Sequence, residues 1–144
     1  MNGYNGSVLA YGQTSSGKTH TMSGIMYNEE QRGIIPRMVS FLFNQIDIAA
    51  EEIEFSVKVS MVEIYMEKIR DLVDITKTNL KISEDPKKGI FIADVTETYV
   101  TEAKEIFDLM RIGNDNRSVG CTDMNAESSR SHSVFILTVH AENA

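Results

Sequence analysis

The block Gly12–Thr19, with the sequence GQTSSGKT, constrains this chain more than any other feature. It matches the pattern G-x-x-x-x-G-K-[ST] letter for letter. In this pattern glycines let backbone amides turn toward phosphate oxygens, and a helix that begins near Lys18 points its positive end at them. The pattern predicts that Lys18 neutralises the β- and γ-phosphates and that Thr19 gives one oxygen to a magnesium ion. The residues expected to hold the phosphates are Gly12, Gln13, Thr14, Ser15, Ser16, Gly17, Lys18 and Thr19.

The residues on either side of the block support a nucleotide site. Val8–Tyr11 is a short apolar run between two glycines, which is typical of a strand buried on both faces of a parallel sheet. Residues 19–22 are compatible with a helix. The alternative is a glycine- and serine-rich turn that binds nothing.

The middle of the chain predicts one helix and one long strand. Apolar residues around Pro36 recur with a period of 3.6, which predicts a helix over about residues 35–49. Apolar and polar residues then alternate over 53–61, which predicts a half-buried strand. The alternation changes phase near Met61, so we expect a bulge or a change of neighbouring strand there.

The second half predicts a hairpin, a helix and a last strand. Strands are expected at Leu80–Ser83 and Ile90–Val100, around a turn at 84–89. Thr101 can cap a helix that ends near the cluster Gly113-Asn114-Asp115-Asn116. A polar loop over about 118–132 precedes a buried strand at 134–139. Helices and strands alternate along the chain, so the predicted fold is an α/β sheet covered by helices.

Composition excludes several classes of protein. The chain has 144 residues, of which 42% are apolar, enough for one domain with a core. No apolar run approaches the ~18 residues of a membrane span, and no signal peptide is evident, so we expect a soluble intracellular protein without a membrane partner. The net charge of −7 argues against nucleic acid. The single cysteine, Cys121, and three scattered histidines argue against a disulfide and a structural metal.

A second polar block, residues 125–132 with the sequence NAESSRSH, precedes the last strand. By itself it fits a solvated loop whose serines cap neighbouring elements. Beside a phosphate loop, its hydroxyls could reach the γ-phosphate and magnesium and be released on hydrolysis. Another candidate for a metal carboxylate is Asp94, after four apolar residues, but it follows a Pro-Lys-Lys-Gly turn and is disfavoured.

Together these blocks resemble a kinesin motor domain over essentially all 144 residues. The matching segments are the phosphate loop with Tyr4-Asn5-Gly6 before it, Gly33–Arg37, Glu63-Ile64-Tyr65, Lys68–Leu72, and Asn125 with Ser128–His132. The resemblance implies ATP and Mg²⁺ as ligands, with Thr19 and Ser129 approaching the metal. It implies catalytic roles for Asn125 and Ser128, which close over the γ-phosphate, for Ser129 beside the metal, and for Arg130, which pairs with a glutamate of the second switch.

The resemblance also implies an incomplete α/β fold of the P-loop NTPase type, with a sheet that has helices on both faces. Residues 1–144 would form one partial motor domain, from the phosphate loop through the first switch. The family's second switch, the adenine-binding segment before the phosphate loop, and the neck are not in this sequence. Full-length relatives are implied to hydrolyse ATP, to dimerise through a coiled coil, and to lie in the cytoplasm on the cytoskeleton, whereas these 144 residues alone would show at most trace turnover.

The implied partner is the microtubule. Both the microtubule and this chain are acidic, so binding would need local positive charge on this chain. Basic side chains that could face it are Lys68, Lys81, Lys87 and Lys88, unless they are ordinary solvated lysines. Two other functions remain open. One is a different P-loop enzyme, against which no Asn-Lys-x-Asp guanine motif occurs. The other is a non-catalytic module that keeps the fold without turnover.

Overall fold

The computed structural model describes residues 3–49, 52–87, 89–119 and 130–143. The chain divides into two compact units, residues 1–44 and 45–144, and each is treated by itself. No helix in the described ranges is both long and apolar enough to cross a membrane.

The first unit carries the phosphate loop and short helices. Its helices are α1 (Lys18–Met22), a 3₁₀ turn η1 (Glu29–Gln31) and the beginning of α2 (Ile34–Asp47). The predicted helix at 35–49 is therefore confirmed, with Pro36 in its first turn. Its buried residues Ile35, Val39 and Leu42 follow the helical spacing that predicted it.

The predicted strand at Val8–Tyr11 is wrong. Residues 3–12 form neither helix nor strand, and Val8, Leu9 and Tyr11 are 57%, 87% and 95% exposed. A strand exists only when a neighbouring strand takes its backbone hydrogen bonds, and none of the described residues pairs with this segment. An apolar run thus shows the tendency to form a strand but not the presence of a partner.

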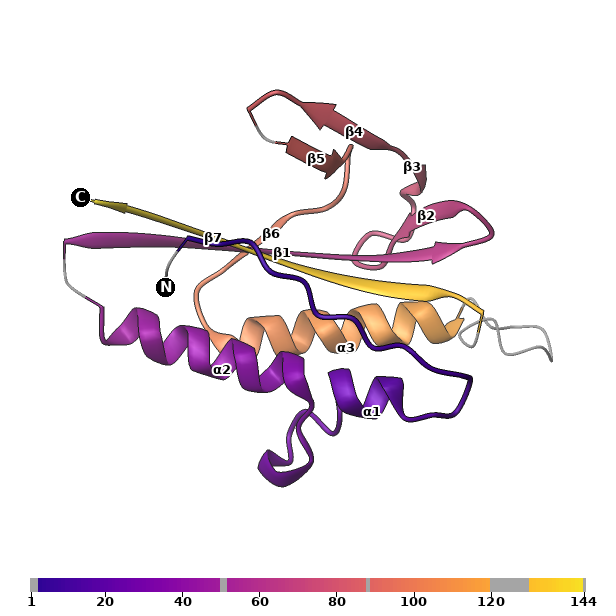
Figure 1. Cartoon of the computed structure of the whole chain (residues 1–144), viewed down its shortest axis with the longest axis horizontal. Helices are drawn as coiled ribbons and strands as arrows, with labels where there is room; N and C mark the ends of the chain where they lie inside the picture. The colour runs from indigo at the N-terminus through magenta and orange to yellow at the C-terminus, as the bar shows by residue number, and fades with distance from the viewer. Residues whose placement is uncertain (1–2, 50–51, 88, 120–129, 144) are drawn as a thin grey trace. The chain divides into compact units, whose positions relative to one another are not determined.

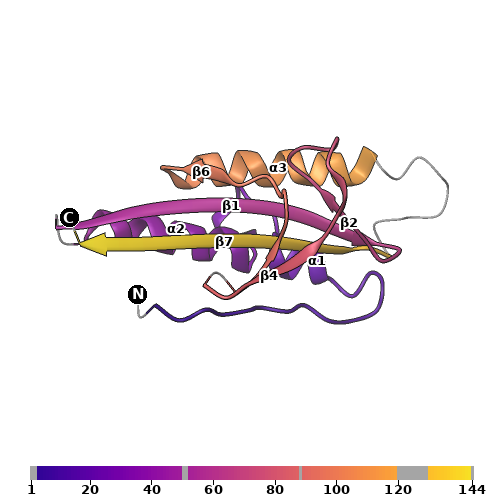
Figure 2. The ribbon, with the colours of Figure 1, turned by 90° about the horizontal axis from the view of Figure 1, so that it is seen from above.

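The second unit is an antiparallel sheet built around one long strand, β1 (Ile53–Tyr65). One edge of β1 pairs with β7 (His132–Asn143) over residues 53–64, so the two long strands run side by side in both views (Figures 1 and 2). The other edge pairs with β6 (Thr98–Val100) at Val57–Val59 and with β2 (Lys68–Asp71) at Val62–Tyr65. The predicted change of neighbour near Met61 is confirmed. Strand β3 (Thr78–Leu80) extends the sheet beyond β2.

The predicted last strand is confirmed as β7, but its predicted burial is wrong. Its side chains at 134–139 are only half-buried. In the described part of the chain, β7 pairs with β1 alone, so its second edge brings no neighbouring side chains over it.

The hairpin is confirmed, but the single strand predicted at Ile90–Val100 is two strands in two sheets. Among the described residues, strands β4 (Ile82–Asp85) and β5 (Gly89–Ile92) pair only with each other, while β6 joins β1. The chain turns between β5 and β6, where Asp94 has a φ of 60°. The first predicted strand, Leu80–Ser83, is also divided, because Lys81 separates β3 from β4.

Helix α3 (Ala103–Val119) covers β1 and β6, and it runs along β1 in both views (Figures 1 and 2). Its Ile106 and Met110 are 0% and 2% exposed and form a core with Val59, Val62 and Leu72. The helix passes through the cluster at 113–116, near which we expected it to end, and continues to Val119. A Cβ at Gly113 would lie 2.6 Å from the Cε of Met61, so this glycine serves close packing instead of a helix stop.

Thr101 lies just before α3, as predicted, with a different hydrogen-bond pattern. Its backbone N–H and its hydroxyl both donate to Oε2 of Glu105, at 2.6 and 3.2 Å. Glu105 therefore closes the start of the helix by reaching back, which is the acidic half of a capping box.

Candidate nucleotide-binding site

The phosphate loop folds as a tight turn that leads directly into α1. The N–H of Ser16 donates to the carbonyl of Gln13 at 3.3 Å, and Ser15 and Gly17 have φ values of 63° and 90°. Gly17 is the residue before the helix, and Thr21 N–H donates back to its carbonyl at 2.9 Å. The predicted helix start near Lys18 is confirmed.

Lys18 folds back over the loop that precedes it. Its Nζ donates to the carbonyl oxygens of Gly12 and Gln13, at 2.7 and 2.6 Å. These carbonyls hold the ammonium group at the mouth of the loop, where it supplies positive charge. An anion in the loop could exchange for these carbonyls without a change of backbone, because the ammonium has three donors on a flexible stem.

The residues of the loop fit a phosphate and its magnesium ion. A Cβ at Gly12 would lie 2.6 Å from Oγ of Ser16, so the loop closes this tightly only with glycine there. Thr19 lies in the first turn of α1 beside Lys18, and its hydroxyl is the hard oxygen donor that magnesium accepts. The described residues hold no cluster of His, Cys, Asp and Glu side chains that could bind a metal by themselves.

The first-switch block is only partly described. Asn125, Ser128 and Ser129, three of the predicted catalytic residues, lie outside the described residues. The fourth, Arg130, is exposed in a turn before β7. Asp94, the disfavoured metal carboxylate, lies in the turn after β5.

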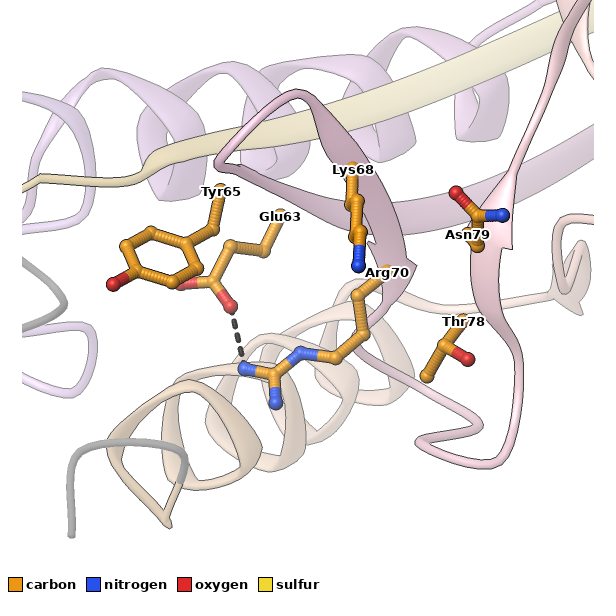
Figure 3. A pocket seen from close by; sticks show the side chains of 6 residues that line it. All are labelled: Glu63, Tyr65, Lys68, Arg70, Thr78 and Asn79. Atoms are coloured by element: carbon orange, nitrogen blue, oxygen red, sulfur yellow. Dashed lines mark hydrogen bonds and ion pairs between the residues drawn. The ribbon is translucent and has the colours of Figure 1, made fainter.

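A buried carboxylate, Glu63 of β1, holds the end of this block at Ser131. Its side chain is 6% exposed, and its Oε1 accepts from Oγ of Ser131 at 2.7 Å and from Nε of Arg117 at 3.3 Å. Arg117 also donates to the carbonyl and hydroxyl oxygens of Ser131, at 3.1 and 3.0 Å. Arg70 of β2 pairs with Oε2 of Glu63 (Figure 3). The network ties β1, β2, the end of α3 and the start of β7 together.

Sequence reasoning missed this network. Glu63 was noted only as part of a matching segment, and Arg117 was not singled out. The available signal was the change of phase at Met61, which moves Glu63 to a position where polar residues of the preceding alternation do not fall.

A hollow of about 360 Å³ opens beside the network. It is lined by Glu63, Tyr65, Lys68, Arg70, Thr78 and Asn79 (Figure 3). Arg70 reaches across it to Glu63, and Lys68 extends from the same strand (Figure 3). None of the phosphate-loop residues line this hollow.

The predicted filament lysines lie at the ends of strands. Lys68 begins β2, Lys81 lies between β3 and β4, and Lys87 lies at the β4–β5 turn. All three are exposed. Lys88 lies outside the described residues.

The pKa of Asp74, in the turn between β2 and β3, is lowered, because the side chain and backbone of Thr76 donate hydrogen bonds to its carboxylate.

The phosphate loop, together with the combination of helices and sheet, defines an α/β chain with a P-loop. The family model described as kinesin motor domain matches residues 1–144. The chain belongs to this family.

Known relatives agree with this assignment. The kinesin heavy chain of Strongylocentrotus purpuratus is 49% identical over 143 residues, which cover 99% of this chain and 14% of that protein. The human kinesin-1 heavy chain is 50% identical over 143 residues, covering 99% of this chain and 15% of that protein. This chain therefore spans only 14–15% of the length of these relatives.

A solved structure shows the same fold. It is described as "Structure of a fast kinesin: Implications for ATPase mechanism and interactions with microtubules", and it is 45% identical to this chain with a TM-score of 0.92. The match covers 99% of this chain and 40% of that one. The predicted α/β kinesin fold and the predicted family are confirmed.

Proposed function

We propose that this chain is the ATP-binding part of a motor that hydrolyses ATP to move along microtubules. The observation that carries the proposal is the phosphate loop, with Lys18 held 2.7 and 2.6 Å from the carbonyls of Gly12 and Gln13 at the start of a helix. Membership of the kinesin family supports ATP as the nucleotide. In this proposal residues 1–144 are one partial motor domain.

The residues of the loop have distinct roles in the proposed site. Backbone amides of residues 12–19 bind phosphate oxygens, and Lys18 moves from its carbonyl partners to the β- and γ-phosphates. Thr19 and Ser129 each give a hydroxyl oxygen to Mg²⁺, which neutralises phosphate charge when bound. Asn125 and Ser128 close over the γ-phosphate, with Ser128 or a backbone group near the attacking water, and Arg130 pairs with a glutamate of the second switch.

The proposed filament contact is the exposed set of lysines in the second unit. Lys68, Lys81 and Lys87, together with Lys88, offer local positive charge in a chain whose net charge is −7. Such charge accelerates association with an acidic surface and weakens as salt rises. The whole protein is proposed to be a cytoplasmic, cytoskeletal homodimer joined by a coiled coil beyond these residues.

Magnesium-dependent binding of fluorescent ATP and GTP analogues tests the nucleotide site. Lys18→Ala removes charge-assisted contacts to phosphate, so we expect ATP binding to weaken by roughly 10- to 150-fold. Lys87→Ala removes an equal charge from an exposed turn and serves as the matched control, with binding within about twofold of the unchanged chain. Equal affinity for ATP in the chain and in Lys18→Ala would contradict the proposed site.

Co-sedimentation with microtubules tests the filament surface. Replacing the four lysines together by glutamate should abolish binding, and the binding of the unchanged chain should fall steeply with salt. Binding that is insensitive to both changes would assign the filament contact to other residues.

A further inference from the structure

The hairpin lobe, residues 81–93, is joined to the main sheet by only two connecting segments. The first comes from β3 through Lys81, and the second leaves through residues 93–97 to β6. Strands β4 and β5 pair only with each other, so no strand of the described main sheet fixes the lobe by pairing. The contacts at its base must therefore set its direction.

These contacts converge on one buried carboxylate, Asp71, at the end of β2. Asp71 is 0% exposed, and its Oδ1 accepts from the backbone amides of Val73 and Asp74, at 2.8 and 3.0 Å. Its Oδ2 accepts from the amide of Thr96 at 2.7 Å. The Asp71 carboxylate thus binds two parts of the chain. One is the turn between β2 and β3, which leads toward the first connecting segment, and the other is the second connecting segment.

Two further bonds complete the base of the lobe. Nζ of Lys77, just before β3, donates to Oγ1 of Thr96 at 3.0 Å. Higher up, the amide of Ala93 donates to the carbonyl of Lys81 at 2.8 Å. The second connecting segment is therefore held at two levels. Thr96 is bound by Asp71 and Lys77, which flank the β2–β3 turn, and Ala93 is bound by Lys81 of the first connecting segment. Asp71 anchors the lower level inside the core.

We infer that Asp71 is a positioning residue that orients the hairpin lobe, and with it Lys81 and Lys87, toward an acidic filament surface. This inference rests on the proposed filament contact. A strand of four residues is about 14 Å long, so a tilt of about 10° at the base moves the tip by about 2.5 Å. Ion pairs are made within about 4 Å, and a shift of this size breaks them.

The substitution Asp71→Asn tests the inference. Its amide nitrogen faces an N–H donor, so one of the anchoring bonds is lost while the side chain keeps its size. Binding to microtubules should weaken about tenfold, and Mg²⁺-ATP binding should stay within about twofold. Loss of a negative charge alone would strengthen binding to an acidic filament, so the expected sign separates positioning from simple electrostatics.

Asp74→Asn is the matched control. It removes the same charge three residues away, from a carboxylate whose partner is Thr76 in its own turn, so filament binding should not weaken. Unchanged or stronger filament binding by Asp71→Asn would overturn the inference, as would equal loss of filament and nucleotide binding. If the unchanged chain binds no microtubules, the proposed filament contact fails and the inference fails with it.

Hydrogen exchange in the unchanged chain tests the anchor without any variant. The amides of Val73 and Thr96 should exchange at least about a hundredfold more slowly than an unstructured chain, because a buried carboxylate accepts from both. Rapid exchange at Thr96 would show that its amide is not held by the Asp71 carboxylate. That result would overturn the role given to Asp71, even if Asp71→Asn does not fold.

Discussion

Replacing Glu63 by glutamine should destabilise the chain by about 3 kcal/mol, because removal of one partner leaves buried charges uncompensated. Glu63 is 6% exposed, and Arg70 and Arg117 around it are 31% and 18% exposed. A glutamine oxygen can replace only one of the two carboxylate oxygens. Its NH₂ group then faces either Arg70, or both Arg117 and the hydroxyl of Ser131.

The size of this effect follows from what is lost. At least one charge-assisted hydrogen bond disappears, worth about 1.5–3 kcal/mol. The remaining bonds lose the attraction of a full negative charge, while partial exposure of both arginines lets water recover part of the loss. A total of about 3 kcal/mol lies at the lower end of the range for a broken buried ion pair.

Urea unfolding followed by circular dichroism measures the change. The matched control is Glu97→Gln, which breaks the Lys58–Glu97 pair at 2.9 Å, where Glu97 is 48% exposed. Exposed pairs contribute about 0–1 kcal/mol, so the control should hardly move the midpoint. If Glu63→Gln destabilises no more than Glu97→Gln, the argument that burial makes the Glu63 network strong is refuted.

Three further predictions concern single positions. Gly17→Ala should weaken Mg²⁺-ATP binding about 5- to 30-fold in a titration, because a left-handed backbone costs a residue with a Cβ about 1–2 kcal/mol. Gly17 has a φ of 90° and open space around it, so backbone strain is the expected cause. Unchanged affinity would contradict this cause. The bond from the Thr101 amide lowers the pKa of Glu105. The stabilisation that Glu105 gives the folded chain is therefore complete above the ordinary glutamate pKa of about 4.3, and it is lost as pH falls through the lower pKa of the folded state. Glu105→Gln should lack this pH-dependent loss of stability in acid unfolding. Identical acid-unfolding profiles of the two chains would contradict the prediction. Gly113→Ala should lower the free energy of unfolding by about 1 kcal/mol in thermal unfolding, since crowding against Met61 outweighs the gain in helix propensity. A stabilised variant would show that the Met61 side chain moves aside freely.

The features predicted correctly are those that local sequence determines. The turn that leads into α1 depends on glycines at fixed spacing, and α2 depends on an apolar period with a proline in its first turn. The change of phase at Met61 correctly indicated a change of neighbour, because one edge of β1 pairs with β6 before that point and with β2 after it.

The features predicted wrongly depend on partners distant in sequence. Val8–Tyr11 has strand-forming residues but no pairing strand among the described residues. Residues 90–100 have continuous β propensity, yet a positive φ at Asp94 sends the two halves to different sheets. The buried carboxylates Glu63 and Asp71 could not be recognised, because sequence shows a polar residue in a strand but not whether donors from other elements surround it.

The pairing of β1 gives this unit a direction-dependent mechanical strength. On one edge, twelve successive residues from Ile53 to Ile64 pair with β7, so pulling the two strands along their length must shear all these bonds at once. On the other edge, β6 and β2 hold short separate stretches, with a single bond from the Leu72 amide to the Met61 carbonyl beside their junction. A force at that junction opens a few bonds at a time, as in unzipping. Strain applied to this unit is therefore transmitted stiffly along β1 and β7, and it is released first at β6 or β2.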